Sequence, residues 1–110
     1  MLEKQSEGVA IKLYNIYLDI FIENGDIAIV VEVKYKMREH HFEEFFNKME
    51  KYRQYADRKQ DKRKFYGAIA AVIINDEHRK KVVDNGIYLI EPSGDSMKIN
   101  IPDDFKPRLW

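Results

Sequence analysis

Cysteine is absent from the 110 residues, which excludes a disulfide framework and a thiolate zinc site. No apolar run approaches the roughly 20 residues that a membrane-spanning helix needs. The N-terminal residues also lack the pattern of a signal peptide. We therefore expect a cytoplasmic protein with no membrane association. A hydrophobic fraction of 45% in a chain of this length predicts one small domain over residues 1–110.

Net charge is absent too, since 19 basic side chains balance 19 acidic ones. Because proteins that bind nucleic acid non-specifically are usually basic, this balance weakly opposes DNA binding. The basic residues are nevertheless clustered, with five of them in the seven residues 58–64. This cluster is either a solvated loop or a surface that contacts phosphates. Our candidate nucleic-acid contacts are Lys36, Arg38, Arg58, Lys59, Lys62, Arg63 and Lys64.

The apolar periodicity predicts an α/β (α+β) fold, a mixed sheet flanked by helices. A stripe from Phe42 to Ala56, spaced three or four residues apart, predicts a helix with one face in the core. We expect its outward face to be solvated, with Glu43, Glu44, Lys48, Glu50, Lys51 and Arg53. The expected strands are 11–23, 26–36, 65–74, 87–91 and 97–101, and the expected helices are 39–57 and 76–86.

Three charged residues interrupt the apolar sequence of the first two expected strands. They are Asp19, Glu32 and Lys34. Asn24-Gly25 is a strong signal for a two-residue hairpin turn. A turn centred there pairs Asp19 with Val30, and it places all three charges on one face of the sheet. The other face is apolar, and we expect it to carry the core: Leu18, Ile20, Ile22, Ile27, Ile29, Val31, Val33 and Tyr35.

The convergence of two carboxylates beside a lysine suits metal-assisted phosphodiester hydrolysis. Mg²⁺ or Mn²⁺ relieves the repulsion between carboxylates, because hard divalent cations prefer oxygen ligands. A neighbouring ammonium can orient the attacking water or stabilise charge on a phosphate. The alternative from spacing alone is a buried ion pair without a metal. We interpret His40 and His41, which follow soon after Lys34, as surface residues rather than ligands.

The order Asp19, then Glu32-Val33-Lys34, resembles the signature of the PD-(D/E)XK nuclease superfamily. The likeness extends to a family of uncharacterised prokaryotic proteins that carry such a domain, over residues 19–26, 31–34, 66–68, 92–96 and 105–110. It implies a restriction-endonuclease-like fold, with Asp19, Glu32 and the carbonyl of Val33 as Mg²⁺ ligands and Lys34 as a catalytic residue. The superfamily usually has a helix before its first strand. Only about ten residues precede that strand here, so we expect a shortened N-terminal helix.

Three functions remain open from the sequence. The first is a metal-dependent nuclease, with DNA as the expected substrate. The second is an inactive module of the same fold for protein interaction or assembly, and the third is nucleic-acid binding without cleavage. Dimerisation would suit an enzyme that cuts two strands. The apolar C-terminal residues Phe105, Leu109 and Trp110 either contact a second copy or cover the domain's own core.

Overall fold

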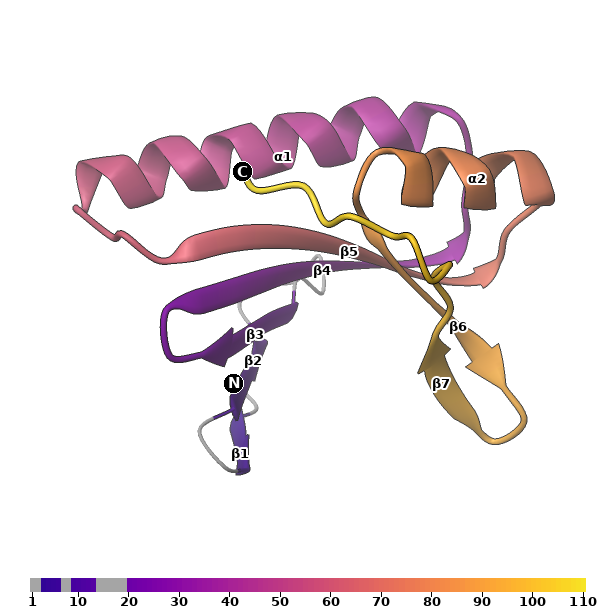
Figure 1. The fold of residues 1–110 in the computed structure, drawn as a ribbon, viewed down its shortest axis with the longest axis horizontal. Helices are drawn as coiled ribbons and strands as arrows, with labels where there is room; N and C mark the ends of the chain where they lie inside the picture. The colour runs from indigo at the N-terminus through magenta and orange to yellow at the C-terminus, as the bar shows by residue number, and fades with distance from the viewer. Residues whose placement is uncertain (1–2, 7–8, 14–19) are drawn as a thin grey trace.

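The computed structural model describes residues 3–6, 9–13 and 20–110, with side chains described from residue 20 onward. Within these ranges, seven strands form one sheet in sequence order. Figure 1 shows their arrangement. The strands are β1 (Glu3–Ser6), β2 (Val9–Leu13), β3 (Ile20–Asn24), β4 (Ile27–Lys36), β5 (Lys64–Ile73), β6 (Tyr88–Ser93) and β7 (Ser96–Ile99). The helices are α1 (His40–Arg58) and α2 (Asp76–Asp84). The expected mixed sheet with helices is therefore confirmed.

Both helices lie on one face of the sheet (Figure 1). Strands β4, β5 and β6 are parallel neighbours, while the other neighbouring pairs are antiparallel. Helix α1 connects β4 to β5, and α2 connects β5 to β6. Crossovers between parallel strands are nearly always right-handed. Because the three strands follow one another in one direction across the sheet, two crossovers of the same hand place both helices on the same side.

The main core fills the space between this sheet face and the helices. Phe42, Phe45 and Met49 of α1 pack there against β4 and β5, where Val30 and Ile69 are fully buried. This position of the core contradicts our expectation for the hairpin. The core face is the one that carries Phe21, Ala28, Val30 and Glu32, because α1 covers that face.

The opposite side, here called the open sheet face, is apolar but only partly buried. Its small buried cluster consists of Val31, Ala68 and Ala70. Tyr35 is 73% exposed, and Val72 is also exposed. By strand alternation and register, the open sheet face comprises Ile20, Ile22, Ile29, Val31, Val33, Tyr35, Tyr66, Ala68, Ala70, Val72, Tyr88, Ile90, Met97 and Ile99.

The first hairpin has a different register from the one we expected. Asn24 pairs with Ile27, so the turn residues are Gly25 and Asp26. Gly25 has φ 61°, which is the left-handed conformation that such a turn requires. The shift moves each partner by two residues, so Phe21 faces Val30 rather than Ala28. An even shift preserves which residues share a face, and the grouping of residues by face therefore remains correct.

The expected first strand, 11–23, is wrong as a single element. Val9–Leu13 and Ile20–Asn24 are two strands, β2 and β3, that pair antiparallel with each other. In the described part of the N-terminal segment, residues 3–6 form β1, which pairs with β2. Apolar residues recur throughout 11–23 with no Gly or Pro between them, and a periodicity of two gives no signal where a chain reverses direction.

The remaining elements agree with the sequence pattern to within a few residues. The Asn75 side chain accepts a hydrogen bond from the backbone N–H of His78 and so caps α2. Gly86 follows α2 with φ 71°, and its backbone lies against Arg108 of the C-terminal segment. None of the helices in the described ranges is long and apolar enough to cross a membrane.

The C-terminal segment covers part of the domain itself. The Trp110 backbone N–H donates to the carbonyl of Phe65, and the Trp110 ring packs near Phe46 of α1. The Phe105 ring lies 4.9 Å from that of Tyr88. Leu109 is 57% exposed. Of the two roles we considered for these residues, Phe105 and Trp110 pack against their own domain.

Candidate active site

Glu32 is the one charged residue that is buried among the described side chains, with 7% of its surface exposed. It lies on β4, on the same face as Ala28 and Val30, and therefore beneath α1. A buried carboxylate is unfavourable unless it is paired and hydrogen-bonded. The structure satisfies this requirement with two lysines, one on β4 and one on α1.

Each carboxylate oxygen of Glu32 has its own ammonium partner. Lys34 Nζ lies 3.2 Å from Glu32 Oε1, and Lys48 Nζ lies 2.5 Å from Oε2. Lys34 is two residues along β4 and so projects from the same face of the sheet. Lys48 reaches the same group from α1. The two lysine side chains are about one quarter exposed, so the cluster is accessible from solvent at its lysine side.

From the sequence we expected Lys48 and Arg53 on the solvated face of the helix, and this was wrong for both, because each side chain is only about one quarter exposed. Arg53 turns instead towards the Phe65 ring and the backbone carbonyl of Asp61.

Lys48 lies three residues after Phe45 and four before Tyr52, which both belong to the apolar stripe. This spacing places Lys48 at the border of that stripe. Its long aliphatic stem can follow the apolar surface while the ammonium reaches Glu32. The border position was the sequence signal that could have identified Lys48.

Asp19, the other carboxylate of the sequence signature, lies outside the described residues. It directly precedes Ile20, and Ile20 pairs with Val31, the neighbour of Glu32. Within the described part of the chain, no group of three or more His, Cys, Asp or Glu side chains is placed to hold a metal ion. Glu32 is therefore the one side-chain oxygen ligand of the signature whose position the structure gives. Val33 is on β4 beside it, and its side chain is 37% exposed on the open sheet face.

His41 adds a titratable group near Lys34. The Arg38 backbone N–H donates to His41 Nδ1 at 2.9 Å, and the His41 backbone N–H donates back to the Arg38 carbonyl. This reciprocal pair closes a turn that leads into α1. Burial of the ring, and then the positive charge of Lys34, lower the pKa of His41. The lowered pKa favours the neutral ring, whose Nδ1 accepts the hydrogen bond from the Arg38 N–H.

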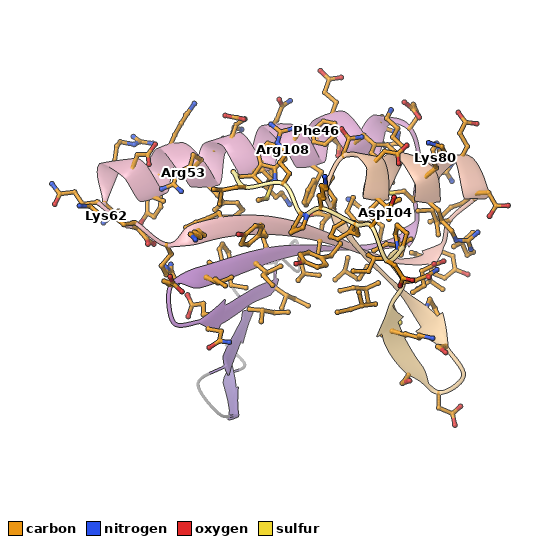
Figure 2. The ribbon with its side chains drawn as sticks, in the orientation of Figure 1. Phe46, Arg53, Lys62, Lys80, Asp104 and Arg108 are labelled. Atoms are coloured by element: carbon orange, nitrogen blue, oxygen red, sulfur yellow. The ribbon has the colours of Figure 1, made fainter. Side chains whose placement is uncertain are left out.

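The predicted phosphate-contacting residues lie in two groups at opposite ends of α1. Lys36 and Arg38 are exposed where β4 leads into the helix. Arg58, Lys59, Lys62 and Lys64 are exposed at and after the end of the helix, where Figure 2 shows Lys62 projecting away from the domain. A 19-residue helix is about 28 Å long, so the two groups cannot bind the same phosphate.

Arg63 differs from the other predicted phosphate-contacting residues because two carboxylates hold it. Its guanidinium lies 2.7 Å from Asp61 Oδ2 and 2.8 Å from Glu23 Oε1. Hydrogen bonds from Arg63 lower the pKa of Asp61, and those carboxylates raise the pKa of Arg63. This ion cluster joins the loop after α1 to β3.

Comparison of the chain with protein-family models, curated proteins and solved structures finds no match. A function for this domain therefore has to be argued from its fold and from the geometry around Glu32.

Proposed function

We propose that this domain is a metal-dependent nuclease of the PD-(D/E)XK type, which hydrolyses phosphodiester bonds of nucleic acid, with DNA as the expected substrate. The observation that carries the proposal is the buried carboxylate of Glu32 with its two lysines. A buried ion pair is poor evidence for stability, since apolar residues of similar volume often serve as well or better. Its presence in an otherwise apolar strand favours a chemical role.

The residues fit a Mg²⁺ or Mn²⁺ site only in part. Glu32 supplies one carboxylate, and the resemblance adds the Asp19 carboxylate and the Val33 carbonyl. Both oxygens of Glu32 already have an ammonium partner, so coordination of a cation requires at least one of these contacts to open. A cation there would supply charge stabilisation for the scissile phosphate.

The lysines would then act on the substrate. Lys34, released from Glu32 Oε1, would orient the attacking water or stabilise charge on the phosphate oxygens. Lys48 would keep its contact with Oε2 and hold the Glu32 side chain in place. Lys34 is thus the proposed catalytic residue and Lys48 a positioning residue.

A cleavage assay on a panel of single-stranded, duplex and branched DNA and RNA tests this function. We expect Mg²⁺-dependent cleavage that is lost in Asp19→Asn, Glu32→Gln and Lys34→Met. Glu77→Gln, which changes an exposed carboxylate on α2, is the matched control and should cleave normally. Unchanged cleavage by purified Asp19→Asn or Glu32→Gln protein would exclude the proposed site.

The second candidate is a non-catalytic module that keeps this fold for protein interaction, assembly or nucleic-acid binding. The contacts of Glu32 favour this candidate, because Lys34 and Lys48 already pair both of its carboxylate oxygens without a metal. Salt-dependent binding of DNA without hydrolysis under any divalent cation would select the binding form of this module.

We also propose that the protein is a homodimer through its open sheet face, and that it acts in the cytoplasm. Large apolar side chains are exposed across that face, with Val33, Tyr35 and Val72 towards its centre and Met97 and Ile99 at the β7 edge. A contiguous apolar surface of this kind is typical of a protein interface. The side chains given above for the open sheet face, from β3 to β7, are all uncharged, so two copies can meet over this part of the sheet without burying unpaired charge.

A further inference from the structure

A cavity of about 430 Å³ lies between the second half of α1 and the strands β3 and β5. Its size lies within the range of small-molecule sites. On the helix side it is lined by residues three or four apart on one face of α1. On the other side it is lined by the ends of β3 and β5 and the loop between α1 and β5. The lining residues are Phe21, Glu23, Tyr52, Tyr55, Ala56, Lys59, Asp61, Arg63 and Phe65.

Aromatic rings form most of the apolar wall of this cavity. The rings of Phe21 and Tyr52 meet edge to face, with centroids 4.9 Å apart. Phe65 lies beneath the guanidinium of Arg63 at 5.6 Å. Tyr55 is 56% exposed, and the Lys59 ammonium lies 5.5 Å from its ring. A cavity with aromatic faces and a cation at its rim suits a flat aromatic group that carries a phosphate.

The negative charges of the two carboxylates that line the cavity are balanced in part by Arg63. Glu23 and Asp61 are both engaged by Arg63, so the three form one ion cluster. That arrangement limits the repulsion that two carboxylates would otherwise exert on a phosphate. Lys59 is exposed and its ammonium contacts the ring of Tyr55, which leaves a positive charge at the rim of the cavity.

The cavity is a short distance from Glu32 along both elements. Tyr52 is one helical turn after Lys48, which is about 6 Å along the helix axis. Phe21 pairs with Val30, two residues before Glu32 and about 7 Å away along the strand.

Tyr55 and Lys59 lie farther along the helix, since Tyr55 is seven residues after Lys48 and Lys59 is eleven, about 10 and 16 Å along the helix axis. About three to five stacked nucleotides of a strand, at about 3.4 Å each, span these distances.

We propose that this cavity binds an unpaired nucleobase a few nucleotides from the cleaved phosphate, so that the substrate is a single strand or has an unpaired nucleotide. The base stacks against Tyr55 and the neighbouring rings, and its phosphate contacts Lys59. A base in a duplex is stacked and paired, and it cannot enter without unpairing. This inference rests on the proposed function for the role of Glu32, but the binding event itself requires no metal.

The test measures binding by fluorescence anisotropy in EDTA, so that cleavage does not interfere. The probes are a labelled single-stranded oligonucleotide, the same oligonucleotide with abasic sites, and the corresponding duplex. We expect the wild type to prefer the base-containing single strand. Tyr55→Ala should weaken that binding about 5-fold or more, because stacking of one base on an aromatic side chain contributes that much or more.

Matched variants separate stacking from folding. Tyr55→Phe keeps the ring and should bind as the wild type does, while Lys59→Gln should weaken binding to abasic and normal strands alike. Lys51→Gln, on the exposed part of α1, is the charge-matched control. Equal affinity for base-containing and abasic strands, or wild-type binding by a folded Tyr55→Ala protein, would overturn the proposal.

The same experiments distinguish this proposal from the proposed nuclease function. Tyr55-dependent binding with no cleavage under Mg²⁺ or Mn²⁺ would keep the base site and reject the nuclease. Glu32-dependent cleavage of duplex DNA that is unaffected by Tyr55→Ala would keep the nuclease and reject the base site.

Discussion

Glu32 is held in place by charges from two different elements, Lys34 two residues along β4 and Lys48 on α1, 16 residues away in sequence. The residue pattern identified Glu32 and Lys34, because charges inside an apolar strand are conspicuous. It missed Lys48, because a lysine at the border of a helical stripe looks like any solvated lysine. Only the packing of α1 on β4 decides which of the many helix charges turns inward.

The contact between Glu32 and Lys48 predicts that their contributions to the free energy of unfolding are strongly coupled. We expect Lys48→Met to lower the free energy of unfolding by about 1–3 kcal/mol, since it removes one of two partners of a buried carboxylate. Chemical denaturation of both single variants and of the double variant Glu32→Gln/Lys48→Met measures the coupling. The double variant should be more stable than the sum of the single effects predicts. Simple additivity would show that the two side chains do not interact in solution.

His41 predicts a loss of stability in acid. Because its folded pKa is lowered, the neutral ring favours folding above the unfolded pKa of about 6.5, and this contribution is lost as the pH falls through the lower folded value. Protonated Nδ1 could no longer accept from the Arg38 N–H. His41→Asn keeps an acceptor that does not titrate. As the pH falls, the wild type should therefore lose more of its free energy of unfolding than His41→Asn does. Equal losses in the two proteins would contradict this role of His41.

Among the secondary-structure elements, the strands and helices after residue 24 were predicted well, but not which sheet face the helices cover. Residues 20–36 carry apolar side chains on both faces, so alternation alone could not show which face lies beneath α1. The order of β4, β5 and β6 decides this, through the hand of the two crossovers. The hairpin register was wrong by one turn position because both Asn24-Gly25 and Gly25-Asp26 are acceptable turn residues.

The contact between α1 and β5 depends on Gly67. A Cβ atom at this position would lie 2.7 Å from the Phe45 ring, too close for any normal contact. We expect Gly67→Ala to lower the free energy of unfolding by about 1–3 kcal/mol, as overpacked core substitutions do. Thermal or denaturant unfolding measures the change. Phe45→Leu in the same background should recover part of the loss. No recovery would mean that the ring is not the obstacle.

Across the domain, one sheet face is covered by helices and the other is open and apolar (Figure 1). We expect the protein to dimerise through the open sheet face. Light scattering coupled to size exclusion should report a dimer for the wild type and a monomer for Tyr35→Lys/Val72→Lys. Lys80→Glu, on the exposed surface of α2, is the control. A monomeric wild type over the accessible concentration range would reject the interface.

The proposed nuclease function depends above all on whether Glu32 belongs to a divalent-cation site or to a metal-free ion cluster. Calorimetric titration of Mg²⁺ and Mn²⁺ into the wild type, Asp19→Ala and Glu32→Gln decides between these two roles. We predict binding by the wild type that is lost in both variants while each remains folded. Absence of binding by the wild type, or equal binding by all three proteins, would contradict the cation site and leave the non-catalytic module as the better description.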